Sequence, residues 1–538
     1  MTTLKTNRAF RITTLLIVLT IGCASLAQAQ VYTQLHNFDW HVEGANPNEP
    51  ALLAQGEDGN LYGTLQTSYP NDGSVFSATP AGVVSPLYFF LGPEGNAPQS
   101  GLSLGFDGNF YGATEWGGVS NTGTAFKFGS SGLTPLYGFG NGPDGGYPWA
   151  TPIQAPDGNI YGVTNNGNSP GKVYRITPSG TFSVIATAPS ETVAPLILGA
   201  DGNLYGTTEY GGTYNRGTVF QLTLKGKLKI IHSFDPSTEG AVPIGPVMQG
   251  ADGKLYGTTS GGGTSSQGII YQMTTGGATK VLHNFQLIEG SDSMAGLVQG
   301  SDKFLYGVAS AGGGNSQGSL FKISTSGTGF QVLHNFQTLD GDTPMSTPTL
   351  HTNGIIYGTT EHGGTPRAGY GVLYSFDAGL KPFASIVVIW SGKVGASIGI
   401  LGQGFSSATG VKFGSGAGTF SVVSDTYMIA SPAQGSTTGN VTILEPSGNL
   451  VTPQVFKVIP SIKDFSPPNG PVGTTVTIDG MSLTQASGVT FGGVKAKTFT
   501  VNSDTQITAV VPTGAKTGTI GITTKGGKAT SSQKFTVQ

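Results

Sequence analysis

Residues 201–206 read Asp-Gly-Asn-Leu-Tyr-Gly, and the 538-residue chain contains a variant of this stretch seven times. The copies are marked by their tyrosines: Tyr62, Tyr111, Tyr161, Tyr205, Tyr256, Tyr306 and Tyr357. Successive tyrosines are between 44 residues apart (Tyr161 to Tyr205) and 51 residues apart (Tyr205 to Tyr256). A repeat of this length indicates one supersecondary unit that is copied in space.

Each copy predicts four short antiparallel strands. In the fourth copy, apolar and β-prone runs occupy residues 194–198, 204–208, 217–220 and 228–234. The segments between them contain Asp201-Gly202-Asn203, Gly211-Gly212 and Lys225-Gly226, whose residues suit tight hairpin turns. Four strands in about 50 residues are typical of one blade of a β-propeller.

The two ends of the repeat region complement each other. Residues 31–38 match the fourth strands at 282–285 and 333–336, whereas the seventh copy ends after its third strand, near Tyr374. The N-terminal strand is therefore expected to complete the last blade, which leaves no exposed sheet edge. This predicts an all-β chain with a seven-bladed β-propeller at residues 31–380, and it disfavours an open solenoid or another blade count.

The repeat resembles the bacterial "choice-of-anchor tandem repeat GloVer-containing" family. Its pattern of Asp-Gly-Asn-Leu-Tyr-Gly-Thr-Thr, Gly-Gly and Gly-Thr-Val-Phe is matched at residues 201–208, 211–212 and 217–220. The first and third copies depart from it, because Asn71-Asp72-Gly73 and Asn166-Gly167-Asn168 replace the Gly-Gly loop. The resemblance implies an exported propeller and implies no particular activity.

A different unit follows Gly379. Val411-Lys412-Phe413-Gly414 recurs 78 residues later as Val489-Thr490-Phe491-Gly492, among short alternating strands that predict two β-sandwiches, at 381–458 and 459–538. The second resembles the IPT/TIG immunoglobulin-like family at Ser466-Pro467-Pro468 and Val511-Pro512. The first diverges, because Val388-Ile389-Trp390 replaces the Ser-Pro start. The resemblance implies spacer or adhesion modules.

Residues 1–29 predict a secretory signal peptide. A basic start precedes the apolar run 12–21, and Ala27-Gln28-Ala29 fits a cleavage site. The alternative is a bacterial lipobox at residues 19–23, which would place a lipid on Cys23. No segment is long enough for a transmembrane helix. We therefore expect an extracellular, periplasmic or cell-surface protein, and ordinary cleavage would leave it without a cysteine for disulfides, thiolate catalysis or metal binding.

Charge and motifs exclude several functions. Removal of Lys5, Arg8 and Arg11 with the signal leaves 23 basic and 29 acidic residues, a net charge of −6 without basic runs, so no nucleic-acid partner is expected. The chain carries no metal, calcium-loop or phosphate-loop pattern, so no cofactor is expected. Residues 314–318 match Gly-x-Ser-x-Gly, but they fall in a predicted hairpin rather than in a strand-to-helix turn.

Residues that recur in most blades are expected to be structural. One such set is the histidine of the fourth strand: His36, His232, His283 and His334. Another is an acid-glycine pair before the first strand: Glu43-Gly44, Glu94-Gly95, Asp144-Gly145, Glu239-Gly240, Glu289-Gly290 and Asp340-Gly341. We expect these carboxylates to accept backbone N–H bonds while the glycine takes positive φ. The alternative is an acidic ring that binds a cation or a sugar.

Residues peculiar to single blades are the candidates for function. Three positions after the Tyr-Gly glycine, only three blades carry a glutamate, each followed by an aromatic residue or histidine: Glu115-Trp116, Glu209-Tyr210 and Glu361-His362. This loop should share a propeller face with the fourth-to-first connections, which supply the other candidates: Trp40, His41, Tyr147 and Trp149, with Tyr214 and Arg367 nearby. Aromatic rings beside carboxylates suit sugar binding. The alternative is that these loops pack on one another.

The leading hypothesis is an exported, non-enzymatic binding or adhesion protein with a polysaccharide or a cell-surface protein as its ligand. One alternative is a polysaccharide hydrolase or lyase, in which two of Glu115, Glu209 and Glu361 would act as acid and base about 5–10 Å apart. The other is a structural component of the cell envelope.

Overall fold

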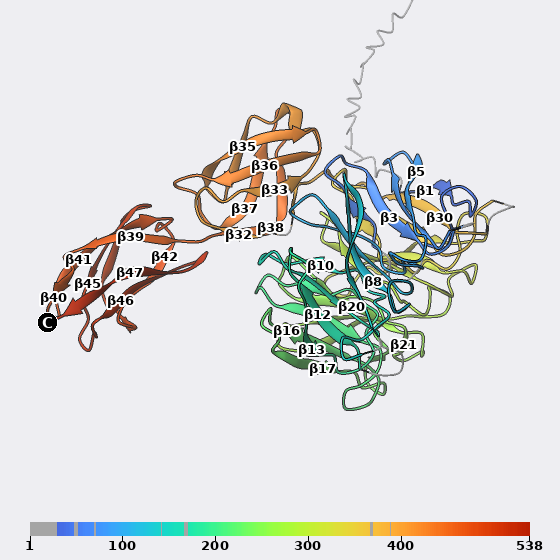
Figure 1. Cartoon of the computed structure of the whole chain (residues 1–538), viewed down its shortest axis with the longest axis horizontal. Helices are drawn as coiled ribbons and strands as arrows, with labels where there is room; N and C mark the ends of the chain where they lie inside the picture. The colour runs from blue at the N-terminus through green and yellow to red at the C-terminus, as the bar shows by residue number, and fades with distance from the viewer. Residues whose placement is uncertain are drawn as a thin grey trace, which may run out of the picture.

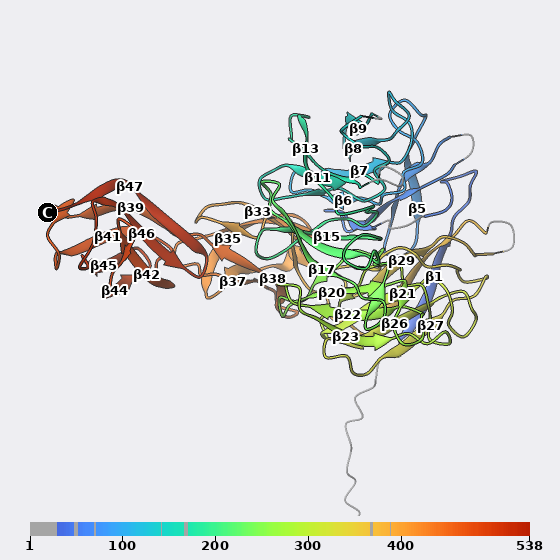
Figure 2. The same cartoon turned by 90° about the horizontal axis from the view of Figure 1, so that it is seen from below.

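A computed structural model describes residues 30–47, 52–68, 71–140, 142–165, 170–365, 369–387 and 389–538. These residues form a ring of small sheets and two β-sandwiches (Figures 1 and 2). The described chain contains one short 3-10 helix, Phe405–Ser407, and no α-helix, so the all-β prediction is confirmed. None of its helices has the length and hydrophobicity needed to cross a bilayer. The predicted signal peptide, Cys23 and Arg367 lie outside the described residues.

Seven four-stranded antiparallel sheets occupy the described part of residues 31–377, one for each repeat. We number them as blades 1 to 7. Their strands are β2 (Ala54–Gln55), β3 (Leu61–Leu65), β4 (Ser74–Ala78) and β5 (Val84–Phe89); β6 (Ser103–Leu104), β7 (Phe110–Thr114), β8 (Thr124–Gly129) and β9 (Gly132–Gly138); β10 (Ile153–Gln154), β11 (Ile160–Val163), β12 (Lys172–Ile176) and β13 (Phe182–Thr187); β14 (Ile197–Leu198), β15 (Leu204–Thr208), β16 (Thr218–Leu222) and β17 (Leu228–Ser233); β19 (Met248–Gln249), β20 (Leu255–Thr259), β22 (Ile269–Met273) and β23 (Thr279–Asn284); β24 (Val298–Gln299), β25 (Phe304–Ala309), β26 (Ser319–Ser324) and β27 (Gln331–Asn335); and β28 (Thr349–Leu350), β29 (Ile356–Thr360), β30 (Val372–Asp377) and β1 (Val31–Asn37). A short ribbon of β18 (Gly240–Ala241) and β21 (Gly261–Gly262) joins two loops of blade 5.

The first strands of the blades face a common axis. Hydrogen bonds join them around the ring, for example from Leu102 N to Leu52 O at 3.1 Å. Blade 7 meets blade 1 in the same way, because Thr349 Oγ1 donates to Leu53 O at 2.8 Å. This closed arrangement of small antiparallel sheets is a propeller-like architecture.

The N-terminal strand closes the ring, as the sequence predicts. Strand β1 pairs antiparallel with β30, from Val31 opposite Asp377 to Asn37 opposite Val372. The next residue, Phe38, is fully buried and packs edge-on against Phe76 of blade 1, with ring centroids 5.3 Å apart. The same edge-on contact joins the end of one blade to the third strand of the next at five further junctions: Phe90–Phe126, Phe139–Tyr174, Phe234–Tyr271, Phe285–Phe321 and Phe336–Tyr374.

The repeated turn is held by one carboxylate. In blade 4, Asp201 Oδ2 accepts a hydrogen bond from the Tyr205 hydroxyl at 2.8 Å, and Oδ1 accepts one from Asn203 N at 3.1 Å. Burial alone would raise the pKa of Asp201, but the hydrogen bonds from Asn203 and Tyr205 outweigh it and lower that pKa. Blades 1 to 6 share the tyrosine–aspartate bond at 2.7–2.9 Å, and blade 7 substitutes Asn353.

The glycine after each tyrosine makes room for an aromatic ring. A Cβ on Gly206 would lie 2.4 Å from the ring of Phe220 in the third strand, which is closer than side chains can approach. The corresponding glycines of all seven blades would meet a third-strand Phe or Tyr at 2.2–2.8 Å. The motif therefore couples a turn to the packing of the blade interior.

The recurring acids bind the fourth strand. His232 Nε2 lies 2.7 Å from Glu239 Oε2, and His283 Nε2 lies 2.9 Å from Glu289 Oε2. In blades 1 and 2 a tyrosine replaces the histidine, and Tyr88 donates to Glu94 at 2.9 Å. Several of these carboxylates also accept backbone N–H bonds, as expected: Asp39 N to Glu43, Leu91 N to Glu94, Gly140 N to Asp144, Gln286 N to Glu289 and Gln337 N to Asp340.

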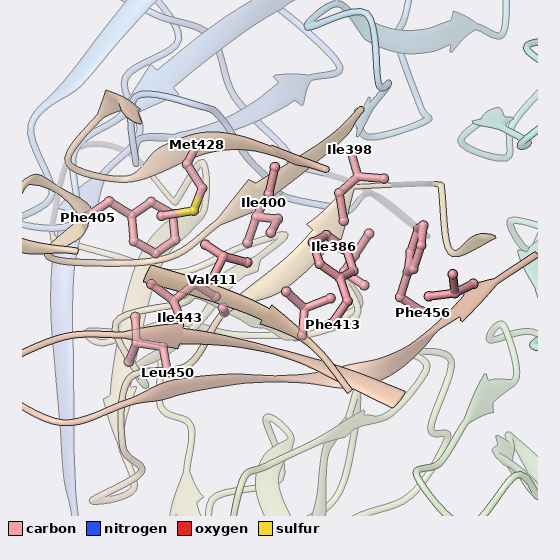
Figure 3. Close-up of a cluster of buried hydrophobic side chains, with 14 residues drawn as sticks. Ile386, Ile398, Ile400, Phe405, Val411, Phe413, Met428, Ile443, Leu450 and Phe456 are labelled. Atoms are coloured by element: carbon pink, nitrogen blue, oxygen red, sulfur yellow. The ribbon is translucent and has the colours of Figure 1, made fainter. Parts of the chain in front are cut away.

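The C-terminal part forms two sandwiches. The first is an eight-stranded sheet folded around one core, which Figure 3 shows: β31 (Ser385–Val387), β33 (Ile398–Leu401), β36 (Tyr427–Pro432), β35 (Gly416–Ser424), β34 (Gly410–Phe413), β37 (Gly439–Leu444), β38 (Leu450–Val458) and β32 (Ser391–Gly392). The second packs two sheets: β39 (Ser461–Ser466), β41 (Thr475–Met481), β45 (Gln506–Val510) and β44 (Phe499–Ser503) against β40 (Asn469–Gly470), β47 (Gly527–Val537), β46 (Gly518–Thr524), β42 (Ala486–Phe491) and β43 (Val494–Lys495).

The first sandwich is docked on the propeller face that carries the repeated turns. Thr426 Oγ1 donates to Glu57 O of the blade 1 turn at 2.7 Å, and Gln403 Nε2 donates to Thr352 Oγ1 of the blade 7 turn at 2.9 Å. Leu104 of blade 2 packs against an apolar cluster of the sandwich that includes Tyr427. The opposite propeller face is thereby the one that stays free of the sandwich.

The closure of the ring gives a stability prediction. Phe38→Ala should lower the free energy of unfolding by about 3–5 kcal/mol, because it opens a cavity at the junction of blades 7 and 1. Chemical denaturation followed by tryptophan fluorescence measures the change. Val31→Ala on the same strand is the control, since Val31 is 48% exposed and should change stability by about 0.5 kcal/mol or less. Equal effects of the two substitutions would contradict the closure role of Phe38.

Candidate binding face

The candidate residues lie on two sets of loops that share one face. In every blade, the residue three positions after the Tyr-Gly glycine donates its backbone N–H to the preceding fourth-to-first connection. Glu115 N bonds to Ala97 O at 3.0 Å, and Glu209 N bonds to Glu191 O at 3.1 Å. The remaining pairs are Gln66–Asn46, Asn165–Tyr147, Ser260–Val242, Ser310–Asp292 and Glu361–Thr343. The loops thus lie together, as the sequence predicts.

This face is opposite the docked sandwich. Strand β15 begins beside the Asp201 turn, which belongs to the sandwich side, and ends at Thr208, directly before Glu209. The strand therefore separates the two loop sets by its full length. We call the loop surface that carries Glu115, Glu209 and Glu361 the open face.

Blades 2 and 3 bring three aromatic candidates to the open face. Trp116 is 39% exposed and meets the ring of Tyr147 edge-on, with centroids 4.8 Å apart. Trp149 is half-buried, and its Nε1 is buried without a hydrogen-bond partner in the described part of the chain. Glu115 is only 8% exposed and accepts a hydrogen bond from Gln99 Nε2 at 2.7 Å. Trp116 therefore faces solvent, whereas its neighbouring carboxylate supports the loop from inside.

Blade 4 carries a perturbed carboxylate. Burial raises the pKa of Glu209, a hydrogen bond from the Tyr210 hydroxyl opposes this, and the charge of Glu191 adds to the rise. Tyr210 is 40% exposed. Tyr214 is 51% exposed and hydrogen-bonds to Asp235 instead. Glu209, Tyr210 and Glu191 therefore form one small acidic site with an aromatic edge.

Blade 7 and the start of the ring supply the remaining candidates. His362 Nδ1 lies 3.6 Å from Glu361 Oε2. Burial raises the pKa of Glu361, the neighbouring His362 opposes this, and Asp342 adds to the rise. Trp40 is 36% exposed and lies 5.9 Å from the Tyr370 ring, and His41 is exposed beside it.

The structure does not pair the three glutamates with one another. They belong to blades 2, 4 and 7, which are not neighbours on the ring. The carboxylate that raises the pKa of Glu209 is Glu191, and the one that raises the pKa of Glu361 is Asp342. Glu191 and Asp342 each belong to the fourth-to-first connection that leads into the blade of the affected glutamate. The acidic pairs of the open face are therefore Glu209–Glu191 and Glu361–Asp342.

Sequence reasoning missed Glu191 and Asp342. Both lie close after the position of the acid-glycine pair, where the residue type varies from blade to blade, so the alignment of the copies would have marked them. Six residues of this segment adopt left-handed backbone angles although they are not glycine: Asn46, Ala97, Tyr147, Val242, Asp292 and Thr343. Such angles are costly for β-branched residues, and their recurrence shows that the blade architecture imposes them.

Comparison with known families assigns most of the chain. The Gloeobacter/Verrucomicrobia repeat matches residues 24–195 and 191–419. The chain belongs to the Gloeobacter/Verrucomicrobia repeat family. An IPT/TIG domain matches residues 460–537, as the sequence predicts for the second sandwich. Both the repeat and the IPT/TIG domain are typical of extracellular or surface proteins.

Several solved structures are similar to this member of the repeat family. TolB from Acinetobacter baumannii is 17% identical over 48% of this chain and 61% of its own, with a TM-score of 0.31. A gluconolactonase from Xanthomonas campestris is 15% identical over 52% and 92%, with a TM-score of 0.34. A surface glycan-binding protein from Prevotella bryantii is 16% identical over 28% and 41%, with a TM-score of 0.22. The chain thus spans less than two thirds of TolB. No curated protein matches it.

The environment of Glu209 gives a testable titration. Tyr210→Phe should raise the pKa of Glu209 further above its ordinary value, because it removes the hydrogen bond that favours the charged carboxylate. Carbon-detected NMR of the glutamate carboxyl groups across pH 3–8 measures it. The control is Tyr214→Phe, since the Tyr214 hydroxyl bonds to Asp235 and should leave the Glu209 curve in place. A lower pKa in Tyr210→Phe would contradict the assignment.

Proposed function

We propose that this protein is exported and non-enzymatic, and that the open face of its propeller binds carbohydrate. The observation that carries the proposal is the exposed indole of Trp116, held edge-on by Tyr147. An aromatic ring fixed in this way offers a flat apolar surface to the C–H face of a sugar. Its orientation is set before the ligand arrives, which lowers the entropy cost of binding.

The carboxylates of the open face supply the polar half of such a site. Glu209 and Glu361 are half-buried, and each can accept a hydrogen bond from a sugar hydroxyl. Tyr210 and His362 stand next to them and are more exposed. Aromatic rings beside hydrogen-bond acceptors suit a polysaccharide ligand. Four further residues of the open-face loops would enlarge this surface: Trp40, His41, Trp149 and Tyr214.

The rest of the chain fits a surface binding protein. The first sandwich covers the turn face through Glu57 and Thr352, so the open face remains available to a large ligand. In this proposal the signal peptide at 1–29 exports the protein, the domains are 31–380, 381–458 and 459–538, and the sandwiches are spacer or adhesion modules. Lipidation of Cys23 is the alternative mode of attachment.

A glycan array with the mature chain tests the proposal. We expect saturable binding to at least one polysaccharide class, and a loss of about tenfold or more in Trp116→Ala, because one stacked ring contributes about 1.4 kcal/mol to a sugar site. The matched control is Val119→Ala in the same loop, since Val119 is 98% exposed and should not matter. An array without saccharide binding would overturn the proposal and favour the structural envelope role.

One observation favours a second candidate, a polysaccharide hydrolase or lyase. Burial and the charge of Glu191 raise the pKa of Glu209, as expected for a carboxyl group that acts as a general acid. Glu209→Gln should then abolish turnover of the polysaccharide identified on the array, whereas Glu115→Gln should retain it, because Glu115 is buried against Gln99. Turnover that survives Glu209→Gln would exclude this candidate.

A further inference from the structure

A cavity of about 1080 Å³ lies between the propeller and the first sandwich. The first strands of blades 1, 2, 4, 5, 6 and 7 border it on the propeller side, and residues of β31, β32, β33 and β38 border it on the sandwich side. It therefore occupies the turn-face end of the ring axis, opposite the open face. Its volume is at the upper end of the ~300–1,000 Å³ that small-molecule sites in proteins span.

The cavity wall is mainly apolar, although glutamines of blades 1, 5 and 6 and several Ser and Thr residues also line it. Three neighbouring blades contribute Leu198, Met248 and Val298, and strand β38 contributes Val451 and Val455. The two valines are 46% and 47% exposed. They therefore border the cavity as apolar side chains that are not packed against the propeller. Protein interiors close such space by packing, and an apolar hollow of this size is instead a feature of ligand sites.

Blade-specific substitutions create part of this wall. The last residue of the first strand is glutamine in four blades, where it bonds to turns: Gln249 accepts from Ala200 N at 2.7 Å and donates to Gly253 O at 2.8 Å. Blades 2, 4 and 7 carry Leu104, Leu198 and Leu350 at this position, and all three line the cavity. In these three blades the hydrogen bonds of the glutamine to the turns are absent, and a leucine side chain lies on the cavity wall instead.

One edge of the cavity is polar. Lys457 lines it, together with Ala200 and Asp201 of the blade 4 turn. The Lys457 ammonium reaches Ala200 O, whereas the Asp201 carboxylate accepts hydrogen bonds from Asn203 and Tyr205 of its own turn. A lysine ammonium at the edge of an apolar cavity is a partner for an anionic oxygen.

We propose that this cavity binds a single-chain amphiphile with an anionic head group, of the fatty-acid class. The chain lies between Leu198, Met248 and Val298 on the propeller and Val451 and Val455 on the sandwich. The carboxylate faces the ammonium of Lys457. A saccharide would leave many of its hydroxyl groups unpaired against this mainly apolar wall, so the ligand class differs from that of the open face.

Binding of a dansyl-labelled undecanoic acid to the mature full chain tests the proposal. We expect a saturable rise and blue shift of dansyl fluorescence that palmitate displaces and hexadecanol displaces less well. Val455→Glu should weaken binding by about tenfold or more, because it puts a carboxylate against the chain. Lys457→Gln removes the ammonium, and should weaken binding about threefold to tenfold.

Val423→Glu is the matched control, because Val423 is 58% exposed on β35 of the same sandwich and does not line the cavity. Small-angle scattering of Val455→Glu should match that of the unsubstituted chain, which shows that the sandwich stays docked. Absence of saturable binding, or equal affinity in Val455→Glu and Val423→Glu, would overturn the proposal. Trp116→Ala should leave the probe's affinity unchanged, so the outcome is independent of carbohydrate binding on the open face.

Discussion

The hydrogen bond from the motif tyrosine to the carboxylate of its turn, present in six of the seven blades, is the contact on which the ring depends. The same carboxylate accepts the backbone N–H two residues after it, so a single aspartate fixes both the turn and the start of the second strand. The glycine after the tyrosine then admits a third-strand ring such as Phe220. Six of the seven third-strand rings pack edge-on against the phenylalanine at the end of the preceding blade, as Tyr271 does against Phe234. The residues of the turn therefore also determine how neighbouring blades pack against each other.

This dependence places the two faces of the propeller under different constraints. The turn face carries the repeated Asp-Gly residues and binds the first sandwich, so its backbone geometry is nearly the same in every blade. The pKa of Glu57 reflects that contact: burial raises it, a hydrogen bond from Tyr427 of the sandwich opposes the rise, and Asp107 and Asp58 add to it. On the open face, the hydrogen bond that recurs between the loops of every blade joins backbone atoms, which leaves side chains such as Trp116 and Tyr210 free to differ.

The two proposed sites follow from this division. The open face combines exposed rings with half-buried acids, which suits a polar ligand of large area. The cavity at the turn face lies between two domains and is lined mainly by apolar side chains, which suits an apolar chain with a charged end. In both places the informative residues are those that break the repeat: Trp116 and Glu209 in one, and Leu104, Leu198 and Leu350 in the other.

The sequence by itself determined the strands, the repeat register and the closure by residues 31–38, because turn chemistry, two-residue alternation and glycine placement are local properties that a single chain segment expresses. It also marked Trp116, Tyr210 and His362 as irregular. Only the tertiary structure decided that Glu115 is buried against Gln99, that Glu209 faces Glu191 rather than another of the three glutamates, and that the first sandwich docks on the turn face. Burial and charge neighbours depend on segments that are distant in sequence, and no local pattern encodes them.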